Sequence, residues 1–167
     1  MDKETILKEF QDTMRHIAAA VYAITTVHDG ERFGIVATAF SSLSFDPPSI
    51  LICVNQDTSI HQPLMQAERF CVNVLGAGNR DVADCFMKTK GDERFGVGEW
   101  TEEFGMPVLA SAQSTLICRT ADRHRFGTHT VFIGEIINAN HRDNAKPLTY
   151  YDRRYIDISQ APDQVSS

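Results

Sequence analysis

The sequence predicts a mainly β protein with small helices, built as a barrel of short strands. Two observations favour this fold class. Runs rich in Val, Ile, Thr, Tyr and Phe alternate with turn residues along most of the chain, and segments with helical spacing are few. A βαβ sheet would instead need a helix between successive strands. The 167 residues can bury one core, so we predict a single domain over residues 1–167.

The first half of the chain begins with a predicted helix. Within residues 1–18, the segment 2–18 carries apolar residues at helical spacing, and Asp2 can cap its start. Strands are predicted at 20–27 and 33–38, joined by a turn at Asp29-Gly30, where glycine adopts a positive φ at little cost. A hairpin is predicted next, turning at Asp46-Pro47-Pro48 and closing with the apolar strand 49–54.

The second half continues with short elements. A short helix is predicted within 58–67, with Ser59 as its N-cap, followed by a strand at 69–75 and a helix at 79–88. Residues 88–100 are polar and are predicted to be loop. Strands are predicted at 115–119, 130–139 and 148–151, with a loop at 124–128 and with 155–158 extending the last edge. We expect a flexible tail at 160–167.

Composition excludes several classes of function. The net charge of −6 and the pI of about 5.4 argue against a nucleic-acid surface, which requires clustered cations. No apolar run approaches the roughly 20 residues that span a bilayer, and the charged N-terminus is unlike a signal peptide. The four cysteines form no CxxC pair, and no histidine spacing suggests a metal site. We therefore predict a cytoplasmic protein with reduced thiols and no metal.

The segment 34–55, GIVATAFSSLSFDPPSILICVN, has the most unusual composition. Its small residues leave backbone N–H groups open to approach, and its hydroxyls can bond a phosphate or a flat polar ring. An ordinary barrel hairpin, in which small residues relieve crowding, is the alternative.

Further segments follow in order: CVN at 53–55 with SI at 59–60, FCVNVL at 70–75, RFG at 94–96, GTHTVFIGEI at 127–136 and PLTYYDR at 147–153. Together with 34–55 they resemble the short-chain flavin reductases, a family of flavin-binding split β-barrels. The resemblance implies that fold, with NAD(P)H-dependent reduction of free flavin by hydride transfer to flavin N5. The flavin could be FMN or FAD, and the co-substrate NADH or NADPH.

The resemblance also implies site residues. The cofactor-binding positions would be Ala37, Thr38, Ala39, Phe40, Ser41, Ser42, Ser44, Cys53, Val54, Asn55, Ser59, Ile60, Asn73 and Arg94. The nicotinamide-binding positions would be His129, Leu148, Thr149, Tyr150 and Tyr151. Four alternatives stay open at these positions: Ser59 as a helix cap, Asn73 as a structural amide, Arg94 as one charge of a solvated loop, and Tyr150 as a packing residue of the terminal strand.

His129 is the one catalytic candidate, with a positioning role. Thr128 stands where relatives commonly have Asp, so the resemblance supplies no carboxylate partner for the imidazole. We expect His129 to donate a positioning hydrogen bond near the nicotinamide; a surface loop histidine is the alternative.

The resemblance further implies a homodimer and a separate flavin-dependent monooxygenase that receives the reduced flavin. Two alternatives share the fold. One is a flavoprotein that holds FMN tightly and passes electrons onward, and the other is a reductase of a different acceptor, such as a corrinoid or a ferric chelate.

Overall fold

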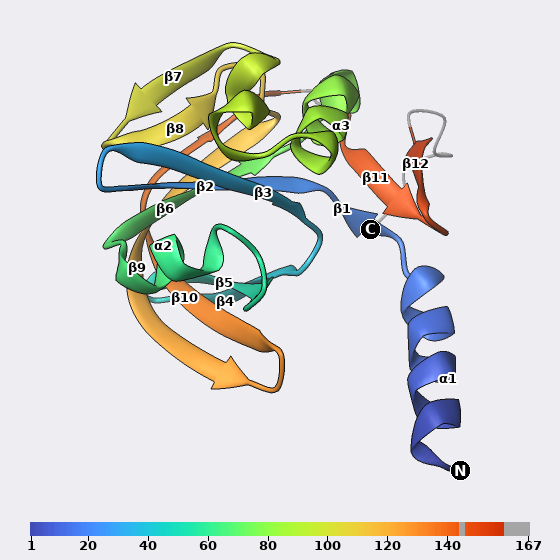
Figure 1. Ribbon diagram of the computed structural model, residues 1–167. Helices are drawn as coiled ribbons and strands as arrows, with labels where there is room; N and C mark the ends of the chain where they lie inside the picture. Colours follow the sequence, from blue (N-terminus) through green and yellow to red (C-terminus); the bar gives the residue numbers. More distant parts are fainter. Residues whose placement is uncertain (144–145, 159–167) are drawn as a thin grey trace.

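The structure is a computed structural model that describes residues 1–143 and 146–158 (Figure 1). Its helices are short, as predicted. They are α1 (Lys3–Arg15), α2 (His61–Gln66), α3 (Arg80–Lys88) and the 3₁₀ helices η1 (Ala77–Asn79) and η2 (Gly91–Gly96). No helix in the described part of the chain has the length and apolar character that crossing a bilayer requires. The predicted tail at 160–167 lies outside the described residues.

Strands make up about half of the described chain. They are β1 (Ala19–Ala20), β2 (Tyr22–His28), β3 (Glu31–Ala37), β4 (Phe40–Phe45), β5 (Pro48–Asn55), β6 (Arg69–Val74), β7 (Trp100–Glu103), β8 (Met106–Leu109), β9 (Ser114–Phe126), β10 (His129–His141), β11 (Leu148–Tyr151) and β12 (Arg154–Asp157). The prediction of a mainly β fold with small helices is confirmed.

The main sheet has seven antiparallel strands in the order β3-β2-β6-β9-β10-β5-β4. Its two edge strands, β3 and β4, follow one another in the chain and are separated by Thr38 and Ala39 alone. The sheet must therefore curl until its edges approach, and these two residues cross between the edges. The result is the split β-barrel that the resemblance predicted. Its two edges come together at Thr38-Ala39.

The two larger apolar clusters of the described chain lie inside the barrel and beneath α3. The barrel interior is filled by alternating residues of its strands, including Ile24, Ile52, Phe70 and Phe132, each fully buried. Alternation places every second side chain of a strand on the inner face. A second cluster packs α3 and η2 against β3, with Phe86 and the neighbouring aromatic rings at its centre. Tyr22 and Phe40 stack with ring centroids 4.6 Å apart, which links β2 to β4 next to the split.

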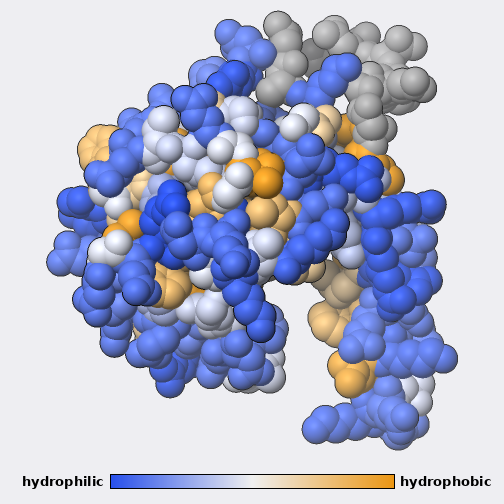
Figure 2. Space-filling view, turned by 45° about the horizontal axis from the view of Figure 1, so that its top comes forward, coloured by the Kyte–Doolittle hydropathy of each residue, from blue (hydrophilic) through white to orange (hydrophobic). Residues whose placement is uncertain are grey.

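The helix α1 stands apart from the barrel (Figure 1). Asp2 caps it, accepting a hydrogen bond from the Thr5 N–H at 2.9 Å, and none of its residues is buried. In the space-filling view the helix stands clear of the barrel, and apolar side chains lie on the side that faces the open space (Figure 2). The large apolar residues at its predicted spacing are half exposed: Ile6, Phe10, Met14 and Ile17.

Five hairpins of the described chain turn on two residues; four of them contain a residue at positive φ, and three of these four place both central residues there. At Asp29-Gly30 the angles are 50° and 78°, as the sequence predicted. The turns at Phe104-Gly105 and Asp152-Arg153 have the same backbone, with φ of 53° and 79° and of 47° and 62°. The fourth, Gly127-Thr128, has a positive φ of 55° at its glycine. The sequence did not predict the hairpin of β7 and β8, because Phe, the residue type at position 104, is uncommon at positive φ.

Several predicted boundaries are wrong. The loop predicted at 124–128 shrinks to two residues, because β9 stays paired with β10 as far as Phe126. The loop predicted at 88–100 contains η2, and Trp100 already belongs to β7. Ser59 is not a helix cap: α2 begins two residues later, its N-cap is Ile60, and that position makes no side-chain capping bond.

Candidate functional site

Three segments that are distant in sequence meet beside the split of the barrel. The first is the crossing Thr38-Ala39, the second is the end of β5, and the third is the start of β10. The backbone N–H of Cys53 donates to the Ala39 carbonyl at 3.1 Å, which ties the crossing to β5. Across the next strand pair, Asn55 lies opposite His129. Positions that the sequence predicted in three separate motifs therefore form one continuous surface.

Where the sequence predicted flavin contacts, the surface is formed by small and polar side chains. Thr38, Ala39, Ser41 and Ser42 are all exposed. The Ser41 hydroxyl donates to the Ser42 carbonyl at 3.0 Å, a local bond that solvent or a ligand can replace. Ser44 differs, because its hydroxyl donates to the Asp46 carbonyl and accepts from the Asp46 N–H, both at 3.1 Å. Ser44 thus shapes the β4–β5 turn and offers less to a ligand.

Arg94 lies where it can meet an anion. Its guanidinium donates to the carbonyls of Thr89, at 3.1 Å, and Gly34, and one of its nitrogens lies 3.5 Å from the Ser59 hydroxyl. Burial lowers the pKa of Arg94, but not enough to remove its charge at neutral pH. Ser59 is exposed, so the pair presents one hydroxyl and one cation to the surface. A phosphate is the ligand that such a pair suits.

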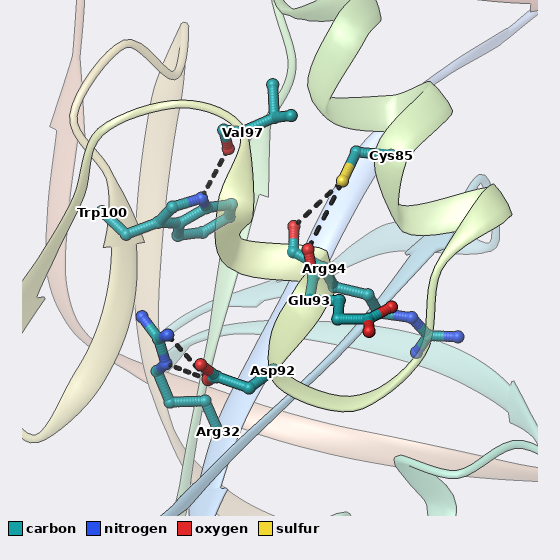
Figure 3. A network of polar contacts seen from close by, with 7 residues as sticks. All are labelled: Arg32, Cys85, Asp92, Glu93, Arg94, Val97 and Trp100. Atoms are coloured by element: carbon teal, nitrogen blue, oxygen red, sulfur yellow. Dashed lines mark hydrogen bonds and ion pairs between the residues drawn. The ribbon is translucent and has the colours of Figure 1, made fainter.

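The segment η2, which carries Arg94, is fixed from two sides (Figure 3). The Cys85 thiol of α3 lies 3.6 Å from the carbonyl oxygens of both Glu93 and Arg94 and can donate its one hydrogen to either. On the other side, Arg32 of β3 pairs with Asp92 at 2.6 Å. The close-up shows both sets of contacts holding the same turn, so the backbone that presents Arg94 is fixed by α3 and by β3 together.

An aromatic cluster supports the same segment. Phe95 packs against Phe86 and Trp100, with ring centroids 5.5 and 5.0 Å apart. The Arg32 guanidinium lies 4.5 Å from the centroid of the Phe95 ring, a cation–π contact. The Trp100 indole N–H donates to the Val97 carbonyl at 2.9 Å (Figure 3). This cluster gives a structural reason for the Arg94-Phe95-Gly96 motif.

His129 is exposed at the first position of β10. Its Nδ1 lies 2.9 Å from the Thr128 hydroxyl, so the residue that replaces the expected carboxylate still contacts the ring. Nε2 has no such contact with Thr128 and is directed by the ring geometry away from it. The imidazole can therefore offer one nitrogen to a ligand while Thr128 holds the other.

The predicted nicotinamide segment approaches the crossing from the other side. A pocket of about 180 Å³ is lined by Val21, Val36, Ala37, Thr38, Met87, Tyr150 and Tyr155. Tyr150 is 36% exposed, and its ring lies 5.8 Å from that of Tyr155. The structure thus brings Tyr150 of β11 next to Ala37 and Thr38. Sequence reasoning missed Met87, an exposed methionine on α3 that completes the wall.

Several predicted contact positions have buried side chains, so a ligand could meet these residues only through their main-chain atoms. Val54 and Ile60 belong to the barrel core, at 2% and 0% exposure, and Leu148 packs in the α3 core at 3%. Thr149 is 7% exposed. These side chains face inward because they alternate with outward-facing neighbours or lie beneath a helix. Tyr151 is half buried, with its ring 6.2 Å from that of His16.

Asn73 is a structural amide. It is fully buried in β6, its side-chain nitrogen donates to the Ala23 carbonyl at 3.0 Å, and its oxygen accepts from the Leu109 N–H at 2.8 Å. These bonds tie β8 to the main sheet. The alternative of a structural amide therefore accounts for the Asn73 side chain, and a flavin contact at this position stays a prediction.

A larger pocket, of about 800 Å³, lies outside this surface, between the β2–β3 and β7–β8 turns, and includes Arg32, Asp92 and Trp100. Among the described residues, no three His, Cys, Asp or Glu side chains gather as metal ligands.

Comparison with known proteins agrees with this geometry. The chain is 38% identical over 148 residues to an FMN reductase (NADH), RutF, of Pseudomonas syringae pv. syringae (strain B728a), covering 87% of this chain and 83% of that protein. It is 36% identical over 162 residues to the reductase component of an FADH(2)-dependent resorcinol hydroxylase of Rhizobium sp. (strain MTP-10005), covering 95% and 90%.

A solved structure has the same fold. The NADH:FAD oxidoreductase SgcE6 of Streptomyces globisporus C-1027 superposes with a TM-score of 0.88 at 29% identity, over 98% of each chain. The model of the flavin reductase like domain matches residues 14–159. This chain therefore belongs to the flavin reductase-like domain family.

Proposed function

We propose that this protein is an NADH-dependent flavin reductase that transfers a hydride from nicotinamide C4 to N5 of FMN or FAD. The observation that carries the proposal is the meeting of Thr38-Ala39, Asn55 and His129 on one surface, with the Tyr150 pocket beside it. Small side chains and hydroxyls on that surface fit a flat ring with polar edges. The relatives named for NADH and for FMN or FAD support the same reaction.

The residues of this chain would bind the flavin and the nicotinamide and orient the two rings. When bound, the flavin supplies the hydride acceptor, so the protein needs no strong acid or base at the ring. Thr38, Ser41 and Ser42 are placed to hydrogen-bond polar ring edges, and Ala39 leaves room for the ring. Holding two flat rings face to face accounts for much of such catalysis, because it removes the entropic cost of their encounter.

The pocket beside Tyr150 suits the nicotinamide half of the co-substrate, because its lining residues are apolar or aromatic apart from the Thr38 hydroxyl. We infer that Tyr150 packs against the nicotinamide ring. The relatives named for NADH favour NADH over NADPH as the co-substrate.

We propose that Arg94 and Ser59 bind the flavin phosphate. Replacing Arg94 with Met removes the cation but keeps much of the buried stem. KM for FMN should rise about tenfold or more, the range for a lost charge-assisted hydrogen bond, while KM for riboflavin, which has no phosphate, should change little. Equal effects on both flavins would contradict the phosphate assignment. Arg80→Met, an exposed arginine on α3, is the matched control.

We propose a homodimer in which the apolar face of α1 packs on a second copy. The exposed apolar side chains along this helix support it, since single copies rarely leave such a stripe in water. Phe10→Glu should shift sedimentation from dimer to monomer at micromolar concentration, while Lys8→Glu on the opposite face should not. A wild-type protein that sediments as a monomer would contradict the dimer.

We further propose that the chain forms a single domain and that the protein is cytoplasmic. It would pass reduced flavin to a separate monooxygenase. The likeness to a resorcinol hydroxylase reductase component supports the partner, and four free cysteines suit a reducing compartment.

A steady-state assay tests the reaction. NADH and NADPH oxidation are compared with FMN, FAD and riboflavin, each over a range of concentrations. We expect saturation in the flavin, as for a substrate, and a higher kcat/KM with NADH than with NADPH. Flavin that copurifies in a one-to-one ratio and does not exchange would favour the tightly bound flavoprotein instead.

A further inference from the structure

Gln56 contacts three successive carbonyls of the β9–β10 turn. Its side-chain nitrogen donates to the Gly127 carbonyl at 3.1 Å and to the His129 carbonyl at 3.2 Å. Its backbone N–H donates to the Thr128 carbonyl at 2.9 Å. One residue at the end of β5 thus satisfies every carbonyl from Gly127 to His129.

This turn needs an anchor, because it lies at the far end of a long hairpin. The pairing of β9 with β6 ends at Arg119 opposite Arg69, whereas β9 itself continues to Phe126. Phe126 is 82% exposed, which shows that the hairpin end projects from the barrel. Support there comes from β5, through the pair Asn55–His129 and through Gln56.

Gln56 is itself well fixed. The Asn55 side chain accepts from the Asp57 N–H at 2.9 Å, and the Asn55 carbonyl accepts from the Thr58 hydroxyl at 2.7 Å. These bonds form a local turn directly after β5. Gln56 therefore fixes the turn that carries His129 relative to the end of β5.

We propose that Gln56 is a positioning residue that holds the main chain of His129, so that the imidazole meets the nicotinamide. The proposal rests on the role proposed for His129. The chemistry requires a donor at position 56, since its side chain faces carbonyl oxygens. A glutamate of the same shape would face them with a carboxylate, which can only accept. When protonated, that carboxyl group can donate one O–H and restore part of the contact.

The first experiment measures KM for NADH with saturating flavin in Gln56→Ala and Gln56→Glu. We expect KM to rise about two- to tenfold in Gln56→Ala, the range for one or two lost neutral hydrogen bonds, with kcat changed less than twofold. Gln66→Glu, an exposed glutamine at the end of α2, should match the wild type. An unchanged KM in both Gln56 variants would overturn the proposal.

The pH dependence of Gln56→Glu separates positioning from simple loss of structure. The ratio of its KM to the wild-type KM should be largest at about pH 8 and fall as the pH approaches about 5.5, because protonation creates the donor. The titratable neighbours Asp57 and His129 occur in every variant, and Gln56→Ala shows how the ratio behaves without a carboxyl group at position 56. The Gln56→Ala ratio should stay flat. A flat ratio for Gln56→Glu would overturn the proposal.

A double-mutant cycle with His129→Ala tests whether Gln56 acts on KM through His129. If Gln56 acts through His129, Gln56→Ala should add less than a twofold change in KM once His129 is absent. A full effect in that background would overturn the proposal and leave the reductase function intact. An unchanged KM in His129→Ala alone would also overturn it, whereas a wild type without NADH:flavin activity would overturn the proposed function itself.

Discussion

The Thr128 hydroxyl lies 2.9 Å from Nδ1 of His129, at the first residue of β10. A hydroxyl can donate to this nitrogen or accept from it, so Thr128 can hold either neutral tautomer of the ring. A carboxylate at the same position would favour the imidazolium. The contact therefore suits a histidine that positions a substrate through a hydrogen bond more than one that supplies a proton.

Replacing His129 with Ala should raise KM for NADH about two- to tenfold and lower kcat less, because a binding contact is lost in the ground and transition states alike. Steady-state kinetics with saturating flavin measure both constants. A general acid would behave differently, with kcat falling roughly 10²- to 10⁴-fold at nearly constant KM. His141→Ala, an exposed histidine at the far end of β10, is the control.

Replacing Ala39 with Leu should weaken flavin binding by about tenfold or more, because the larger side chain enters the space left for the ring. Ser42→Ala removes one hydroxyl and should cost at most about two- to tenfold. Flavin titration by fluorescence measures both affinities. Ala139→Leu, at an exposed position late in β10, controls for added bulk on a strand. Unchanged affinity in a folded Ala39→Leu protein would move the site elsewhere.

Gly134 lies in β10 against the barrel core. A Cβ there would come within 2.5 Å of the Phe70 ring and 2.7 Å of the Cys118 Cβ. Gly134→Ala should therefore lower the free energy of unfolding by about 1–3 kcal/mol, the usual cost of overpacking. Gly78→Ala, where a Cβ meets nothing within 4 Å, should change it by less than about 1 kcal/mol. Urea unfolding of both variants tests the packing, and equal stability of the two would contradict it.

His61 makes folding sensitive to acid. It is 4% exposed, and its Nε2 lies 2.8 Å from the Thr130 hydroxyl. Burial, with a smaller contribution from the Arg125 charge, lowers its pKa below the ordinary value of 6.5. Below pH 6.5 the unfolded chain therefore binds more protons at His61 than the folded chain does, so stability is lost as the pH falls.

His61→Gln should remove this contribution. Between about pH 6.5 and pH 5, the free energy of unfolding of the His61→Gln variant should fall less than that of the wild type. Urea unfolding at each pH measures both values. Parallel curves for the two proteins would show that His61 titrates alike in the folded and unfolded states.

The sequence predicted the turn at Asp29-Gly30 and missed the β7–β8 hairpin, and it predicted the strands on both sides of Asp152-Arg153 without the turn between them. Asp29-Gly30 is a familiar pair for two positive φ angles, whereas Phe104-Gly105 and Asp152-Arg153 adopt the same backbone with a bulky or charged residue. The polar end of β9 was also missed. Its residues beyond Arg119 lack apolar alternation, and only their pairing with β10 makes them a strand.

The motifs predicted the site residues but could not orient every side chain. Along β5, Ile50, Ile52 and Val54 are buried while Cys53 and Asn55 are half exposed, which is the alternation of a strand with one inner face. Applied to the motif, that alternation would have placed the Val54 side chain in the core. Asn73 could not be decided in this way, because its partners on β2 and β8 become neighbours only in the folded barrel.

The central claim is that flavin is a substrate reduced at the surface where Thr38-Ala39, Asn55 and His129 meet. The most direct test mixes the purified protein with excess NADH and a larger excess of FMN or FAD without oxygen, and follows the loss of flavin absorbance near 450 nm. Our account predicts that many equivalents of flavin are reduced per protein chain, and that Ala39→Leu slows the reaction at subsaturating flavin. Reduction that stops at about one equivalent per chain, or that proceeds equally well in Ala39→Leu, would contradict it.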